Sequence, residues 1–563
     1  MAGVGGPNTS SDSKSNVSPK GSALASAALQ APNPNSADPH PPKVNTDAGS
    51  PAWWLKYLVN QLLARQGEYR KRKEYFEGDQ MLPKGDQRYM RALKHLQTLA
   101  ATNYIGMITT TPVERMEIQG FRFGDPGTMD EDATEIWANS DMELQSHTIH
   151  MNAAKYGLAY ALVTPPAEGQ QYPTITAEDP RTAIVYRDPT KPTKALAGLR
   201  MWEDEIVGRI LAVVYLPEGA YGFVGPYLYE TDGLTIQDLQ ERLTQQFPSH
   251  SGFTPSGFVP NPDDVQEVAL TEYVWRPDTG PIPTGECGRD IRRVQDRINQ
   301  TIFQRMCITH FQAYKQRWAS GITIPTKGRH KGRKAPFDPG YDTLWAVESD
   351  VAKFGEFSEA DITQILEAVR DDVADIAALT KTPAHYLMGK MANISGETLT
   401  QAESGLVSKT RIRMSSMGWS HGRVMKLCFA YMGDTEKATA ATSAVIWSNP
   451  GRELIADTAL AGTQWQTLGV PLPLIMEAQG NWTDDQIAFA TQYAEEQEQK
   501  QLVLQQQQME MQQQNAVELA KVGGAAKPGA PGKPGTAQKP ATKPGAKTAP
   551  ASPKKKPMKG APK

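Results

Sequence analysis

A long run without Pro or Gly lies near the centre of the chain, from Asp290 to Trp318. Its apolar residues form two adjacent stripes at helical spacing: Ile291, Val294, Ile298, Ile302 and Met306 in one, and Phe303, Cys307, Phe311, Tyr314 and Trp318 in the other. An apolar face this wide needs cover on more than one side. The pattern predicts one long, well-covered helix that occupies most of residues 288–318.

A second helix is expected over residues 358–380. Ser358 and Asp361 resemble a capping box in which Asp replaces the usual Glu. The apolar residues that follow recur at i, i+3, i+4 and i+7: Ile362, Ile365, Leu366, Val369, Val373 and Ile376. This stripe predicts that one side of the helix is buried against a neighbouring element.

Acidic residues occupy much of the remaining surface of this second helix. At about 100° per residue, three acids fall opposite the apolar stripe and two on its flank, namely Glu367, Asp371 and Asp375, then Asp361 and Asp372. Within 361–376 only Arg370 opposes them in charge. The face is either an ordinary solvated surface or a wall that repels duplex DNA, which carries about one negative charge per 1.7 Å of axis. Both interpretations stay open on the pattern alone.

Two segments that contain Gly and Pro flank this second helix. Residues 319–357 carry a nearly contiguous basic cluster: Lys327, Arg329, Lys331, Arg333 and Lys334. Such runs also occur in nuclear localisation signals, so the cluster is not specific by itself. After the second helix, Pro383 and Gly389 interrupt the helical pattern within residues 381–395.

A third and longer helix is expected over residues 396–432. Ser395 is a good N-cap, and the apolar pattern continues to about Tyr431. At 1.5 Å per residue the helix would be roughly 54 Å long. Three glycines within the pattern each weaken a helix: Gly405, Gly418 and Gly422. A helix of this length is suited to cross a large assembly as a strut.

The N-terminal half alternates helical and β-like patterns. Helices are expected from Trp53 to Lys73, from Tyr89 to Met107 and within 131–160. Short runs separated by Pro and Gly predict strands at 112–124, 159–164, 183–186, 195–202, 210–216 and 268–275. The polar stretch 237–264 predicts an insertion or a long loop. These elements together predict an α+β fold.

Both ends of the chain differ in composition from the middle. Residues 1–50 are rich in Ser, Asn, Pro, Ala and Gly, and residues 521–563 contain Lys but no acid, although the whole chain has a net charge of only −3. Neither end can bury enough apolar surface to offset the entropy lost on ordering. Both are expected to be disordered, and the Gln-rich stretch 501–514 is expected either to extend a helix or to join the disordered tail.

Several function classes find no support in the sequence. Three cysteines lie too far apart to form a metal site or a disulfide framework: Cys287, Cys307 and Cys428. The sequence contains no apolar run of about 18 residues, no apolar N-terminal signal, and no GxxxxGK[ST], GxSxG or HExxH motif. His147 and His150 could ligate a metal, but packed or surface histidines are more common. We expect no enzyme activity, no cofactor, no metal and no membrane partner.

Short features follow one another along the chain in a specific order. They are Tyr75-Phe76-Glu77-Gly78, Gly120-Phe121, Tyr156-Gly157, Asp296-Arg297-Ile298-Asn299, Asn393-Ile394-Ser395-Gly396 and Trp447-Ser448-Asn449-Pro450. In this order and spacing, from about Trp53 to Glu498, the chain resembles the portal proteins of tailed double-stranded DNA bacteriophages, of the siphophage type common in actinobacterial phages. No single motif among them is diagnostic.

The resemblance implies a portal-type fold and assigns a role to each region. The regions are a mixed α/β wing over 51–287, stem helices over 288–318 and 358–380, a small clip over 319–357, a tunnel loop over 381–395, a long wing helix over 396–432, a helical crown over 433–500 and a Gln-rich, then basic, tail over 501–563. About twelve copies would form a ring.

The resemblance also implies site residues and partners. The channel wall would be Asp361, Glu367, Asp371, Asp372 and Asp375, the tunnel loop would carry Lys381, His385 and Lys390, and the basic cluster 327–334 would lie on the clip. Double-stranded DNA would pass without sequence preference. The terminase large subunit, later a head–tail adaptor, the major capsid protein and a scaffold protein are the expected partners. The protein would reside at the portal vertex of the virion, and in the host cytoplasm during assembly.

Two alternatives come from other function classes. Another structural head or tail morphogenesis protein would lack the order of helix, basic segment, helix, loop and long helix. A DNA-binding regulator built on the basic tail and the clip would need a compact reading domain that the sequence does not show. The family pattern does not supply the basic tail, which in a portal protein would touch packaged DNA or scaffold.

Particle shape distinguishes these interpretations. We predict that the purified protein forms rings of about a dozen subunits with a central hole, because the family resemblance implies a ring-shaped channel. Negative-stain microscopy and sedimentation measure this. A strictly monomeric, compact particle at micromolar concentration and physiological salt would contradict the portal interpretation.

Overall fold

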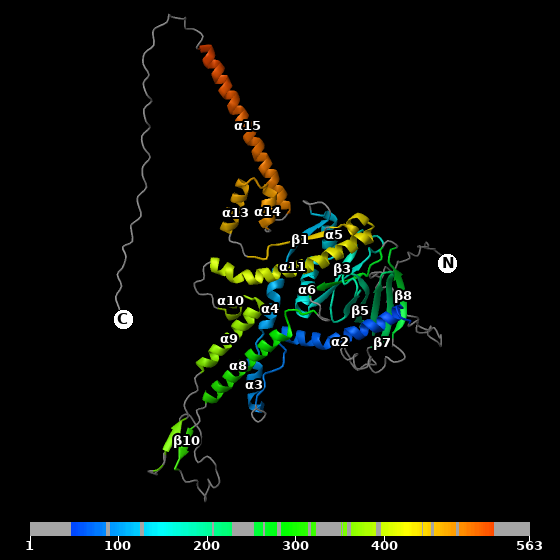
Figure 1. Cartoon of the computed structure of the whole chain (residues 1–563), viewed down its shortest axis with the longest axis vertical. Coiled ribbons are helices and arrows are strands. Elements are labelled where there is room, and N and C mark those ends of the chain that lie inside the picture. Colours follow the sequence, from blue (N-terminus) through cyan, green and yellow to red (C-terminus); the bar gives the residue numbers. More distant parts are fainter. Residues whose placement is uncertain are drawn as a thin grey trace, which may run out of the picture. The chain divides into compact units, whose positions relative to one another are not determined.

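The computed structural model describes residues 47–85, 90–123, 129–204, 206, 208–227, 253–262, 265–277, 283–313, 317–321, 351, 353–356, 362–389, 396–441, 443–451, 455–479 and 484–522. Some sequence-based expectations lie outside these residues: those for 1–46, Asp361, Lys390, 523–563 and the basic cluster Lys327, Arg329, Lys331, Arg333 and Lys334. The chain forms two units, one up to Ala488 and one from Phe489. The combination of long helices and antiparallel sheets confirms the expected α+β class (Figure 1).

The two larger sheets of the first unit are antiparallel and are here called the β part. One has the order β4 (Ala183–Arg187), β5 (Ala195–Asp204), β6 (Arg209–Leu216), β7 (Gly219–Tyr227) and β8 (Thr254–Pro260). The other has the order β3 (Thr174–Glu178), β2 (Leu158–Thr164) and β9 (Leu270–Val274). Five of these strands confirm the sequence prediction. Tyr160 and Leu162 of one sheet join Val213 and Tyr215 of the other in a shared buried cluster, which couples the two sheets.

The expectation of an insertion or loop over 237–264 was wrong for its last part, because β8 pairs there with β7. The sequence pattern did not predict this strand, because it contains Pro255, Gly257 and Pro260. Proline is tolerated on an edge strand, where its missing N–H need not face a neighbour, and β8 is an edge strand.

Helix α2 (Pro51–Glu77) covers one face of the five-stranded sheet. Its start follows from local rules, since the Ser50 hydroxyl accepts from the Trp53 N–H at 3.3 Å and Pro51 occupies the first turn. It ends at Gly78, whose φ of 88° suits a glycine C-cap. Leu58 and Leu62 are fully buried against the sheet, which fixes the helix in place.

The single helix expected from Tyr89 to Met107 is two helices, α3 (Met90–Ala100) and α4 (Tyr104–Val113). Asn103 starts the second one, because its side-chain oxygen accepts from the Gly106 N–H at 2.8 Å while its amide donates to the Phe76 carbonyl at 2.7 Å. Strand β1 (Ile118–Phe123) and helices α5 (Glu131–Asn139) and α6 (Met142–Tyr156) follow.

Helix α8 (Arg289–Ala313) ends earlier than the expected helix to Trp318. Residues Arg317–Ser320 instead form β10, which pairs antiparallel with β11 (Lys353–Glu356). Trp318 lies opposite Gly355, where a Cβ atom would come within 2.5 Å of the indole ring. The indole therefore covers a glycine across the hairpin, and this contact replaces the expected helical stripe.

Helix α9 (Thr363–Thr380) begins after the expected capping box, with Ile362 at the N-cap. Its packing against α8 confirms the two apolar stripes, since Ile298, Ile302, Val373 and Ile376 share one buried cluster (Figure 1). The segment expected as a loop after it contains a short helix, α10 (Ala384–Met388).

Helix α11 (Gly396–Met432) is one unbroken helix of 37 residues, as expected. Two of its glycines permit close contact with β12 (Ser443–Trp447), because a Cβ at Gly422 would lie 2.7 Å from the Ser443 hydroxyl and one at Gly418 would lie 3.2 Å from the Trp447 ring nitrogen. Strand β12 pairs with β1. Residues 443–447 therefore pair with a strand of the N-terminal half, which corrects their assignment to a purely helical region over 433–500.

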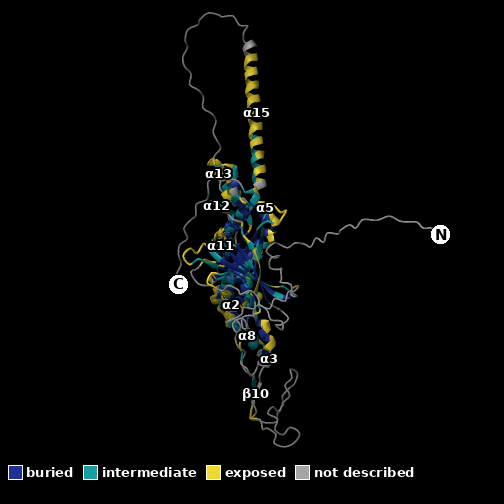
Figure 2. Cartoon of the chain, turned by 90° about the vertical axis from the view of Figure 1, so that its right-hand side faces the viewer, coloured by how far each residue is buried: buried dark blue, intermediate teal, exposed yellow. Residues whose placement is uncertain are grey.

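Three short helices complete the first unit: α12 (Thr435–Thr439), α13 (Ile455–Thr467) and α14 (Leu472–Gln479). The second unit is described from Phe489 to Val522 and is formed by helix α15 (Asp484–Val522). The Gln-rich stretch 501–514 is thus helical, which is the first of the two structures expected for it. Most described residues of α15 are exposed (Figure 2).

A pair of histidines lies fully buried between α6, α11 and β9. The Nε2 atoms of His150 and His421 are 2.9 Å apart, and His421 Nδ1 lies 3.0 Å from the Tyr273 hydroxyl. Burial lowers the pKa of His150 to about 3 and holds the pKa of His421 well below its ordinary value. Both imidazoles are therefore neutral in the folded protein, whereas His147, the other expected metal-ligand candidate, is exposed.

We predict that this pair makes the fold sensitive to acid. Below about pH 6.5 the two histidines bind protons in the unfolded chain but stay neutral in the folded chain. The free energy of unfolding therefore falls toward pH 3, by at most about 1.4 kcal/mol per pH unit for each histidine. The double variant His150→Gln/His421→Gln does not titrate there and should show a smaller drop in melting temperature between about pH 7 and pH 5. The exposed His147→Gln serves as control. An unchanged drop in the double variant would contradict this assignment.

Candidate functional site

The α8–α9 pair carries an ion pair that the α9 sequence alone does not reveal. The Arg297 guanidinium of α8 lies 2.8 Å from a carboxylate oxygen of Asp372 and 2.8 Å from one of Asp375. The Asp372 side chain is 15% exposed, and the Asp375 side chain is 64% exposed. The flank of the acidic face is thus partly neutralised from the neighbouring helix.

The centre of the acidic face is open. Glu367 and Asp371 are exposed and lie one helical turn apart on α9, opposite the side that packs on α8. No ion pair to either acid is found among the described residues. Of the five acids expected to act together, the structure thus places Glu367 and Asp371 on an exposed surface and gives Asp372 and Asp375 a cationic partner.

The expected tunnel-loop residues occupy different environments. Lys381 is exposed and ends α9 in the left-handed region, with φ 53°. His385 lies in the first turn of α10 with its ring edge-on to Tyr386, at a centroid distance of 4.6 Å. Its Nε2 atom is buried and has no hydrogen-bond partner among the residues that the structure describes.

A buried polar network connects α11 to the end of α9, and the sequence patterns did not reveal it. Glu286 accepts from the Trp275 ring N–H at 2.8 Å and lies 3.4 Å from Lys409 Nζ and 3.5 Å from Arg413. Lys409 also donates to the carbonyl of Thr380 at 2.8 Å. Burial lowers the pKa of Lys409, and nearby Glu286 opposes that shift. In the sequence, two cations within the apolar pattern of this helix indicate that an acidic partner exists. No local feature of the sequence identifies Glu286 as that partner.

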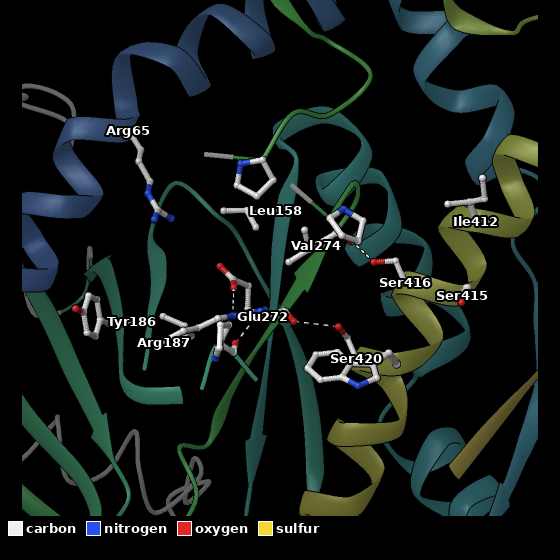
Figure 3. A pocket seen from close by; sticks show the side chains of 15 residues that line it. Arg65, Leu158, Tyr186, Arg187, Glu272, Val274, Ile412, Ser415, Ser416 and Ser420 are labelled. Carbon is white, nitrogen blue, oxygen red and sulfur yellow. Dashed lines mark hydrogen bonds and ion pairs between the residues drawn. The ribbon is translucent and has the colours of Figure 1, made fainter. Parts of the chain in front are cut away.

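A groove of about 910 Å³ lies between α2, the smaller sheet, β4 and α11 (Figure 3). Several of the polar groups drawn there have partners. Arg187 pairs with Glu272 at 2.5 Å, and the Ser416 and Ser420 hydroxyls donate to the backbone carbonyls of Val274 and Glu272. Both serine hydroxyls are therefore held by backbone carbonyls. A serine nucleophile would instead donate to a neighbouring base.

Among the residues that the structure describes, no group of three or more His, Cys, Asp or Glu side chains could hold a metal ion. Over the same residues, every helix is too short or too polar to traverse a lipid bilayer.

The sequence matches the phage portal protein family of the SPP1 Gp6-like type over residues 55–513. The match covers most of the chain, which therefore belongs to this family of structural, non-enzymatic phage proteins. Family membership implies that the protein is a component of the virion. It also implies an oligomeric ring that is associated with the capsid and with DNA.

Two curated relatives agree with this placement. The chain is 22% identical over 378 residues to the portal protein of Mycobacterium phage D29, covering 65% of this chain and 72% of the relative. It is 21% identical over 378 residues to the portal protein of Mycobacterium phage L5, covering 65% and 73%.

Replacing Arg297 tests the ion pair across α8 and α9. Arg297→Gln should destabilise the fold by about 0.5–1 kcal/mol, because the pair is half-exposed and screened by solvent. The loss in melting temperature should shrink at high salt. Arg293→Gln, an exposed arginine on the same helix, is the matched control. If the two variants melt alike at low salt, Arg297 does not join the helices.

Proposed function

We propose that this chain is one subunit of the portal vertex, a ring of about twelve copies through which double-stranded DNA enters the capsid and later leaves it. Membership of the portal family supports the ring and its place in the virion. The open acidic face of α9 is the observation that carries the channel assignment.

The channel would work by repelling the duplex rather than by binding it. Duplex DNA has a dense negative charge, and a basic lining would hold it through release of counterions. Glu367 and Asp371 are exposed carboxylates on one side of α9, and they would repel the phosphates and let the duplex slide. Asp375 would add to this charge only in part, because Arg297 is bound to it.

The other regions would take the roles that the family implies. Residues 51–287 with α11 would form the wing, α8 and α9 the stem, the segment between them the clip, and α10 part of the tunnel loop. The clip would dock the terminase large subunit and then the head–tail adaptor, and the wing would meet the major capsid protein. The basic tail after Lys521 would touch packaged DNA or scaffold. Assembly would take place in the host cytoplasm.

Charge reversal on α9 tests the channel wall. The double variant Glu367→Lys/Asp371→Lys should form normal rings, because both side chains are exposed, but should slow packaging and ejection, because lysines would grip the phosphates. Extending the reversal to Asp375 should deepen the defect. Nuclease-protected DNA per particle and phage yield are the measurements, with ring shape followed by negative stain.

The control carries the same charge change elsewhere. Glu168→Lys/Glu218→Lys alters two exposed acids in turns of the β part and should package normally. Normal DNA protection and yield in the α9 variant would remove the channel-wall assignment. Equal defects in both variants would mean that total charge, rather than the α9 face, matters.

A further inference from the structure

One arginine connects four segments that are far apart in the sequence. Arg115 lies just after α4, and its Nη2 atom donates to the Tyr386 hydroxyl at 2.7 Å and to a Glu403 carboxylate oxygen at 2.9 Å. Its Nη1 atom donates to the carbonyl of Pro450 at 2.9 Å. The Tyr386 hydroxyl donates in turn to the second oxygen of Glu403 at 2.9 Å. These contacts join α4, α10, α11 and the segment after β12.

Because the cluster is buried, each of its polar groups relies on the others, rather than on water, for hydrogen bonds and opposite charge. The Glu403 side chain is 2% exposed and the Arg115 side chain 14%. A carboxylate removed from water is tolerated only when cations and hydrogen-bond donors replace the lost water, and here Arg115 and Tyr386 do so. Burial, then the bond to Glu403, raises the pKa of Tyr386, so the hydroxyl keeps its proton and remains a donor.

The second contact between α11 and this region lies six residues further along the helix. Lys409 donates to the Thr380 carbonyl at the end of α9, as described above. Helix α11 thus contacts the chain at Thr380 and again at Tyr386, on either side of Lys381 and His385. The Thr382 N–H donates to the Ala377 carbonyl between the two contacts, at 3.0 Å. Residues 380–386 are therefore attached at both ends to one helix, α11.

We propose that Tyr386 is a positioning residue: held between Arg115 and Glu403, its hydroxyl fixes α10 on α11, so that Lys381 and His385 keep one position relative to the wing helix while DNA passes. The position matters for DNA only if the proposed channel function is correct. The attachment itself does not depend on that function, and the two can be tested separately.

The test uses the full-length ring and the variant Tyr386→Phe. This change removes only the hydroxyl, so rings should still form, although their melting temperature should fall because the buried Glu403 carboxylate loses one donor. Hydrogen exchange of backbone amides in a peptide covering 381–389 should become about tenfold faster, the factor that corresponds to one lost hydrogen bond to a charged group. The amount of DNA packaged per particle should fall.

The matched control is Tyr172→Phe. Tyr172 also donates to a glutamate, Glu135, but on an exposed surface of the β part. Its replacement should change neither exchange in 381–389 nor packaging. Glu403→Gln, which removes the charge but keeps an acceptor for Tyr386, should give an intermediate exchange rate.

The outcomes separate the attachment from the channel. Faster exchange in 381–389 together with reduced packaging supports the proposal. Unchanged exchange overturns it, whatever happens to packaging. Faster exchange with normal packaging also overturns it, since the position of the segment would then not matter for DNA. Failure of the proposed channel function is detected independently, by normal packaging in the charge-reversed α9 variant.

Discussion

A charge that is removed from water must meet an opposite charge or several hydrogen-bond partners, and along α11 this requirement determines where neighbouring segments lie. Glu403 is paired with Arg115 and Tyr386. Lys409 and Arg413 both lie near Glu286, and Lys409 also donates to the end of α9. Apolar packing alone tolerates some sliding between elements, but these buried groups tolerate little, because each shift would leave a charge unpaired. The long helix therefore serves as the reference to which the end of α9, the segment before α8, and α10 are attached.

The same electrostatic rule distinguishes the two sides of α9. Along one edge of α9, Asp372 and Asp375 pair with Arg297 of α8, so the charge at this edge is partly neutralised. On the opposite side, Glu367 and Asp371 face solvent, where water rather than protein stabilises their charge. One helix can thus pack tightly on one side and present negative charge on the other. This arrangement is suited to a surface past which a polyanion moves, as the proposed channel would need.

Sequence patterns predicted elements well where the information was local. The stripes of α8 and α9 and the continuous α11 follow from side-chain period, and five strands of the two larger sheets follow from short apolar runs. The prediction was wrong where the structure of a segment depends on a partner far away in the sequence. Trp318 continues a helical stripe in the sequence, yet it covers Gly355 across a hairpin. Residues 443–447 follow the long helix in sequence, yet they pair with β1. Gly418 and Gly422, which indicated weakness, instead allow that strand to approach.

The candidate site divides in the same way. The sequence by itself determined that α9 has an acidic face, because the positions of Glu367 and Asp371 relative to the apolar stripe depend only on helical geometry. It also determined the family, through the order of short motifs along most of the chain. Only the tertiary structure decided that Arg297 neutralises one flank, that the His150–His421 pair is buried, and that Tyr386 is held by Arg115 and Glu403. These partners lie tens to hundreds of residues apart, and their pairing depends on burial, which only the folded chain defines.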